Sequence, residues 1–124
     1  MSKLGCLCGH VIRDQSDSLP YKAAFIRDRD DQFLFDQITK DAAKFTEAAS
    51  VEGMAPHIAA QLPDGASITA TELFVDRISS AFAGLASDMY ECESCGRIWL
   101  QKKGTNTFVS FKPDEGDYHA VLAV

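Results

Sequence analysis

The sequence has no long apolar run. No stretch approaches the roughly 18 apolar residues that a transmembrane helix needs. Residues 1–12 contain one lysine and few consecutive apolar side chains, far short of the hydrophobic region of a secretory leader. We therefore expect a cytoplasmic protein that has no membrane association.

Cationic residues are also scarce. The 12 Lys and Arg residues are outnumbered by 18 Asp and Glu residues, which gives a formal net charge of −6. Nucleic-acid binding needs a basic surface, and the one adjacent cationic pair is Lys102-Lys103. This balance disfavours nucleic acid as a partner and favours a basic protein.

Common catalytic motifs are absent from the sequence. It contains no Gly-x-Ser-x-Gly, no phosphate-binding Walker loop, no dinucleotide fingerprint and no His-Glu-x-x-His. The three histidines, His10, His57 and His119, have no neighbours that suggest a nucleophile and its base. We therefore expect a protein that is not an enzyme. An enzyme that uses His57 or His10 with nearby carboxylates remains an alternative.

Four cysteines are present, in two close pairs near the two ends of the chain: Cys6 and Cys8, then Cys92 and Cys95. Each pair is followed at once by a glycine, Gly9 or Gly96, which permits the tight turn of a metal-binding knuckle. Two such pairs supply the four ligands of one tetrahedral Zn²⁺ site. A site closed by four sulfurs is structural, because no position is left for water or substrate.

Other uses of the cysteines are less favoured. Disulfides need an oxidising compartment, and a reactive dithiol usually lies at a helix N-terminus, whereas Cys92 follows an expected helix. The carboxylates of Glu91 and Glu93 disfavour a free thiolate there, and a zinc ion would offset them. An iron–sulfur cluster remains an alternative, as does His10 in place of Cys6 or Cys8.

Length and patterning predict one α+β domain, residues 1–124, with knuckles at 4–12 and 90–101 and a helical insert of at least two helices at about 28–90. Both chain ends are expected to build one small antiparallel sheet around the zinc site. Strands are expected near both knuckles, over 21–26, and in a hairpin of 97–101 and 107–112. Apolar residues spaced three or four apart predict helices over about 31–49 and 69–90, each burying one face. The matching faces most simply pack on each other or on a common sheet.

The ends of these helices also have sequence signals. The aspartates at 28–31 are expected to cap the first helix, and Thr69 with Glu72 forms a capping box for the second. Residues 56–62 are expected to make two helical turns, ended by a turn at Pro63-Asp64-Gly65.

The paired Cys-Gly knuckles resemble those of zinc-ribbon proteins over about 25 residues. Together with Asp17-Ser-Leu-Pro-Tyr-Lys22 and the segment from Tyr90 to Arg97, they also resemble a group of small bacterial cytosolic proteins. Proteins of this kind often neutralise toxins or join protein complexes, so the resemblance suggests an immunity or antitoxin protein that binds a basic toxin. The alternative is a nucleic-acid-associated zinc ribbon that uses Arg97, Trp99, Lys102 and Lys103.

Overall fold

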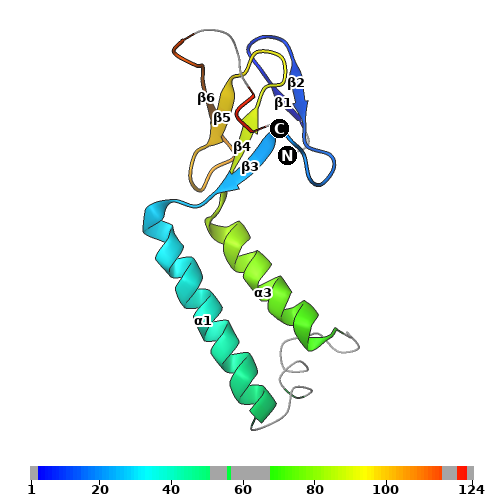
Figure 1. Cartoon of the computed structure of the whole chain (residues 1–124), viewed down its shortest axis with the longest axis vertical. Coiled ribbons are helices and arrows are strands. Elements are labelled where there is room, and N and C mark those ends of the chain that lie inside the picture. Colours follow the sequence, from blue (N-terminus) through cyan, green and yellow to red (C-terminus); the bar gives the residue numbers. More distant parts are fainter. Residues whose placement is uncertain (1–2, 51–55, 57–67, 116–119, 123–124) are drawn as a thin grey trace. The chain divides into compact units, whose positions relative to one another are not determined.

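The computed structural model describes residues 3–50, 56, 68–115 and 120–122. The chain divides into two compact units (Figure 1). The first unit combines residues 1–25 with residues 87–124, and the second contains residues 26–86. The helical insert is thus one unit, and the two ends of the chain together make the other. The expected single domain stays a prediction.

The described residues of the first unit form two antiparallel sheets, whereas the sequence predicts one. A two-stranded sheet pairs β1 (Lys3–Gly5) with β2 (Val11–Arg13). A four-stranded sheet has the order β3-β4-β5-β6. Its strands are β3 (Lys22–Phe25), β4 (Ser87–Glu91), β5 (Ile98–Gln101) and β6 (Phe108–Phe111). Both terminal segments therefore contribute strands to one sheet, in which β4 pairs with β3 and β5.

The core of this unit is small and includes two of the cysteines. Its buried residues are Cys6, Ile12, Tyr90, Cys92 and Trp99. Tyr90 and Trp99 are directly paired on β4 and β5, and the Tyr90 ring also packs on Phe108 at 5.6 Å between ring centroids. Because both knuckles enter the core, the cysteine cluster is part of the packing.

In the described part of the second unit, the long helices α1 (Asp28–Ser50) and α3 (Ala70–Leu85) pack on each other. The rings of Phe45 and Phe74 meet edge to face, with centroids 5.1 Å apart. The capping box is confirmed: Thr69 Oγ1 accepts from the Glu72 N–H at 3.1 Å, and Glu72 accepts from the Thr69 N–H at 3.0 Å. The α+β prediction, with helices inserted between the knuckles, is confirmed.

The predicted end of the second helix is wrong. The helix was expected to continue to about Tyr90 and to include Met89, but α3 ends at Leu85. The segment Ser87–Glu91 is instead the strand β4, because it is paired on both sides in the sheet. Ala86, at the end of α3, has an extended backbone with ψ of 149°, which directs the chain into that strand.

The aspartates expected to cap the first helix lie inside it. The helix α1 begins at Asp28, so Asp28, Asp30 and Asp31 occupy its first turn. There they face the positive end of the helix dipole. Apart from residue 56, the turns expected at 56–62 and 63–65 lie outside the described residues, as do His57 and His119. Within the described part of the chain, no helix is both long and apolar enough to cross a membrane.

Candidate metal centre

The first knuckle is the turn between β1 and β2. The Cys6 N–H donates to the carbonyl of His10 at 2.8 Å, and the Gly9 N–H donates to the carbonyl of Cys6 at 3.0 Å. Gly9 has φ of +97°, a conformation that a residue with a Cβ rarely adopts. The turn thus needs glycine directly after Cys8, as the sequence predicts.

The second knuckle, between β4 and β5, repeats this hydrogen-bond pattern. The Cys92 N–H donates to the carbonyl of Arg97 at 2.8 Å, and the Gly96 N–H donates to the carbonyl of Cys92 at 2.9 Å. Gly96 also has positive φ, at +77°. The second turn has one more residue between its cysteines. The tighter Cys-x-Cys spacing therefore gives a shorter form of the same turn.

The two knuckles place all four cysteine sulfurs together. The Sγ atoms of Cys6, Cys8, Cys92 and Cys95 all lie within 4.8 Å of one another. Across the two knuckles, Cys6 Sγ is 3.5 Å from Cys95 Sγ and Cys8 Sγ is 3.6 Å from Cys92 Sγ. A tetrahedron with Zn–S bonds of 2.3 Å has sulfurs about 3.8 Å apart, so the cluster fits a zinc-sized ion. The four cysteines are free thiols, not disulfides.

The thiols differ in acidity because their surroundings differ. Burial opposes ionisation of Cys6, but N–H groups of Cys8 and Trp99 and the thiols of Cys95 and Cys92 outweigh it and lower its pKa to about 6. Burial raises the pKa of Cys92 to about 12, and the thiols of Cys8 and Cys6 add to the increase. Burial also raises the pKa of Cys95. A metal ion would therefore have to displace protons from Cys92 and Cys95.

The indole N–H of Trp99 is a polar group that sequence reasoning did not assign to the site. The atom is buried and makes no hydrogen bond of normal geometry within the described structure. It nevertheless lies close enough to Cys6 to lower the pKa of that thiol. A thiolate held by a metal would give this donor an acceptor, since metal-bound sulfurs accept hydrogen bonds from surrounding groups. The sequence signal for such a role is the position of the tryptophan, three residues after the knuckle glycine Gly96.

His10 lies beside the cluster and does not belong to it. Among the described residues, the group of ligand atoms within 4.8 Å contains the four sulfurs alone. His10 Nε2 instead lies 3.7 Å from a carboxylate oxygen of Glu93, which is in the other knuckle. The alternative in which His10 replaces a cysteine therefore receives no support from this geometry.

Two carboxylates fix the chain around the cluster. Asp14 accepts from Lys22 Nζ at 2.6 Å and from the Tyr90 hydroxyl, which joins the loop after β2 to β3 and β4. Glu91 is fully buried, and its Oε2 accepts from the N–H groups of Val121 and Leu122 at 2.7 and 3.1 Å. Glu91 immediately precedes Cys92, so it ties the end of the chain to the second knuckle.

Comparison with known proteins gives a family and no nearer relative. No curated protein matches the chain, and no solved structure matches it. Residues 2–115 match a family model described as a domain of unknown function, DUF8617. The match includes both knuckles and the whole helical insert. The chain belongs to the DUF8617 family.

Proposed function

We propose that this chain is a non-enzymatic zinc-binding protein that acts by binding another protein. The observation that carries the proposal is the cluster of four cysteine sulfurs drawn from both ends of the chain. Four protein ligands complete a tetrahedral zinc site, so substrate has no coordination position there. The metal's role would be to hold the two knuckles together and stabilise the first unit.

A basic protein is the partner that the charge favours. The chain carries a net charge of −6, and four thiolates around Zn²⁺ would add about two further negative charges by charge counting. An acidic surface accelerates association with a basic partner and discriminates against acidic ones. A basic toxin, neutralised by an immunity or antitoxin protein, is the specific partner that we propose.

The nucleic-acid alternative loses its stacking residue. Trp99 is only 9% exposed and belongs to the core, so its ring is not available to a base. Lys102 and Lys103 are exposed in the turn between β5 and β6. They are the one adjacent pair of cationic residues in a chain that has 18 Asp and Glu residues.

The metal assignment is tested by Cys92→Ser. We expect one zinc per chain in the wild type by elemental analysis, and loss of bound zinc in the variant with a clearly lower melting temperature. Ser94→Ala, an exposed change in the same knuckle, is the matched control and should keep both properties. A Cys92→Ser protein with unchanged zinc content and melting temperature would contradict the metal site.

The partner assignment is tested by affinity capture at low and high salt with paired charge reversals. Asp114 and Glu115 form an exposed acidic pair that begins three residues after the end of β6, whereas Lys102 and Lys103 form the exposed cationic pair before this strand. We expect a basic protein to be captured at low salt, and D114K/E115K to weaken that capture more than K102E/K103E. If only K102E/K103E matters, and the wild type shifts DNA or RNA at low salt, the nucleic-acid alternative replaces the proposal.

A further inference from the structure

The pair of helices in the second unit has very little core of its own. Among the described residues of α1 and α3, the buried apolar side chains are Ala48 and Leu73. The other residues of the contact between the helices are half-buried, including Phe45 and Phe74. Helices gain most of their stability by burying an apolar face, so two helices with so small a core indicate a further packing surface.

One side of α1 carries uncharged side chains between Phe35 and Thr46, and the same spacing reaches aspartates, Asp28 and Asp31, in the first turn of the helix. Each of these uncharged residues is three or four positions from another member of the group, so they share one face of the helix. They are Phe35, Ile38, Thr39, Ala42 and Thr46. Phe35 is 59% exposed, although it is large and apolar.

One side of α3 has the same character. Its residues follow a regular spacing of four, three, four and three, which keeps them on one face. They are Thr71, Val75, Ile78, Phe82 and Leu85. Val75 is 53% exposed and Phe82 is 40% exposed. The charged residues of this helix, Glu72, Asp76 and Arg77, fall outside this spacing.

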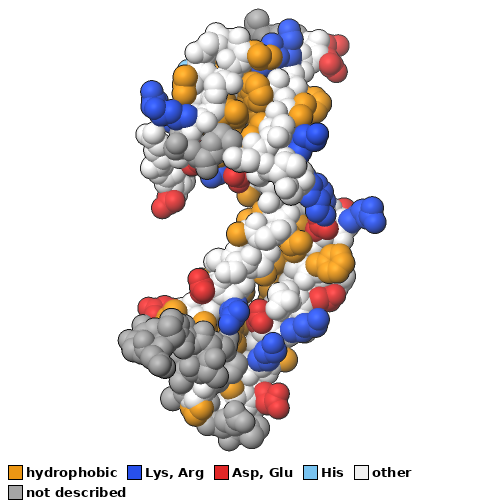
Figure 2. Space-filling view, turned by 180° about the vertical axis from the view of Figure 1, so that it is seen from behind, with side chains coloured by type: hydrophobic (Ala, Val, Ile, Leu, Met, Phe, Trp, Pro, Cys, Tyr) orange, Lys and Arg blue, Asp and Glu red, His pale blue; other side chains and the backbone are white. Residues whose placement is uncertain are grey.

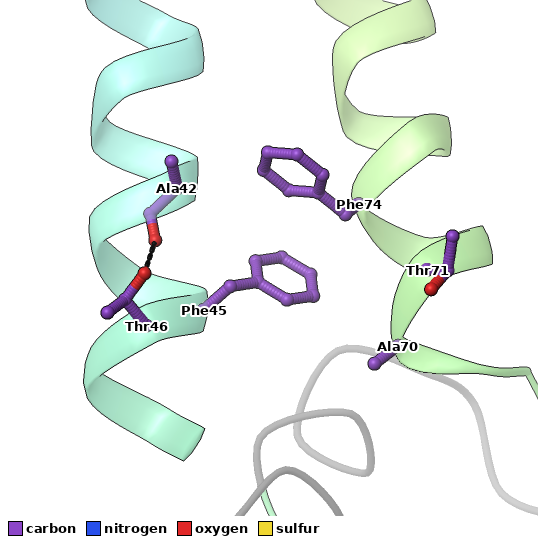
Figure 3. A pocket seen from close by; sticks show the side chains of 6 residues that line it. All are labelled: Ala42, Phe45, Thr46, Ala70, Thr71 and Phe74. Atoms are coloured by element: carbon purple, nitrogen blue, oxygen red, sulfur yellow. Dashed lines mark hydrogen bonds between the residues drawn. The ribbon is translucent and has the colours of Figure 1, made fainter. Parts of the chain in front are cut away.

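A pocket shows that these two sides face the same way (Figure 3). It has a volume of about 300 Å³, and Ala42 and Thr46 line it together with Ala70 and Thr71. The rings of Phe45 and Phe74 point toward each other between the helices and also line it. The two rows of residues therefore form one continuous surface, which we call the uncharged face.

Other parts of the helical surface are strongly charged. Figure 2 shows a side of the helical unit on which Lys and Arg side chains lie among Asp and Glu side chains. Phe33 is 66% exposed, but it lies two positions from Phe35 and so points to a different side of the helix. Phe35 thus lies within the uncharged face, and Phe33 is a phenylalanine on the same helix that lies outside it.

We propose that the uncharged face binds the same face of a second copy of this chain, so that two helical pairs form a four-helix bundle. Two chains that each carry a net charge of −6 repel each other, and contact through a face without charges avoids placing like charges together. A two-fold contact also needs a surface that is complementary to itself, which a face of aromatic, aliphatic and hydroxyl side chains provides.

The size of the face suits such a dimer. The helix α3 has 16 residues. At 1.5 Å per residue it is about 24 Å long, and two helices side by side are about 20 Å wide. The resulting projected area of about 500 Å², increased by side-chain relief, approaches the roughly 800 Å² per partner of an ordinary specific interface. This dimer goes beyond the proposed function, which concerns a different protein as partner.

Sedimentation equilibrium of the full, zinc-loaded chain tests the proposal. We expect the wild type to be a dimer at micromolar concentration, with a melting temperature that rises with protein concentration. The substitutions Phe35→Glu and Phe82→Glu should each weaken the dimer at least about 100-fold, because a carboxylate would be buried without a partner. Phe33→Glu is the matched control, and we expect it to remain dimeric.

Far-ultraviolet circular dichroism establishes that the helices of each variant are folded, and Phe82→Ala gives a milder change where Phe82→Glu does not fold. A wild type that is monomeric at every concentration would overturn the proposal, because the face would then be covered by the chain itself or by another protein. A dimer that Phe33→Glu disrupts and Phe35→Glu leaves intact would overturn it equally.

Discussion

Trp99 is the residue at which the core of the first unit meets the sulfur cluster. Its ring is buried in the core, and its N–H, without a hydrogen bond of normal geometry, lies near Cys6. We expect Trp99→Phe to keep the packing and lose the donor, which should weaken zinc binding by about 10–100-fold. Competition with a chromophoric zinc chelator measures the change.

Tyr21→Phe is the matched control for that experiment. Tyr21 packs against the same core and donates a hydrogen bond from its hydroxyl to the carbonyl of Arg13, away from the sulfurs. Its loss should lower stability slightly and leave zinc affinity nearly unchanged. Equal zinc affinities in Trp99→Phe and the wild type would show that the indole N–H does not act on the metal site.

Asp14 predicts a dependence of stability on pH. Burial opposes ionisation of Asp14, but hydrogen bonds from Lys22 and Tyr90 outweigh it and hold its pKa below the ordinary 3.8. Its contribution to stability is therefore present above pH 3.8 and is lost as the pH falls through the lower folded-state pKa. We expect Asp14→Asn to cost about 1–3 kcal/mol in free energy of unfolding at pH 7 and less below pH 3.8.

Urea unfolding at pH 7 and pH 3 measures this difference. Asp17→Asn, an exposed change in the same loop, is the control and should have little effect at either pH. If the cost of Asp14→Asn were as large at pH 3 as at pH 7, the contribution would not depend on ionisation of Asp14.

At this scale the sequence predicts the sulfurs better than their surroundings. Cysteine spacing and the following glycines have a recognisable chemistry, so the four ligand candidates could be chosen from sequence. The hydrogen-bond partners of Asp14 and Glu91 could not be predicted from sequence. Tyr90 is far from Asp14 in the chain, Val121 is far from Glu91, and a single carboxylate has many possible uses. The buried Trp99 was open to two interpretations, and its burial assigns it to the core.

The two knuckles are the elements that determine the geometry of the cluster, and their glycines can be tested directly. A Cβ at Gly9 would meet no atom within 4 Å, so the cost of Gly9→Ala arises from its φ of +97°. We expect this change to destabilise the zinc-loaded protein by about 1–2 kcal/mol. Thermal unfolding measures it.

Gly5→Ala is the control for that change. Gly5 also has open space where a Cβ would lie, but it is in the strand β1 and does not have positive φ. Alanine there should be neutral or slightly stabilising. A Gly9→Ala protein as stable as Gly5→Ala would mean that the first knuckle tolerates a different turn.

Helix boundaries show where sequence patterns stop being decisive. Thr69 and Glu72 define the start of α3 through local chemistry, and the structure agrees. Its end was misplaced because Met89 continues the helical spacing by coincidence. The strand β4 forms there because its backbone pairs with β3 and β5. The strand β3 is distant in sequence, and β5 comes after β4 in the chain. A pattern within one segment does not contain that information.

The division of the whole chain into two units can be observed with two signals. The sequence has one tryptophan, Trp99, in the first unit, while both long helices are in the second. We expect removal of zinc by a chelator to lower the unfolding temperature seen by tryptophan fluorescence more than that seen by circular dichroism at 222 nm. Equal shifts in both signals would instead support the single cooperative domain that the chain length predicts.

Phe25 and Ser87 are the last residues paired between the strands β3 and β4. This pairing has a consequence for how the protein could be altered. Two antiparallel strands paired at these positions need only a two-residue reverse turn between them. Everything from Ile26 to Ala86 therefore occupies the place of a hairpin tip. An exchange of this insert for Asn-Gly, or for an unrelated helical module, would leave every strand partner and all four cysteines in the sequence, so the first unit could accept other inserted modules.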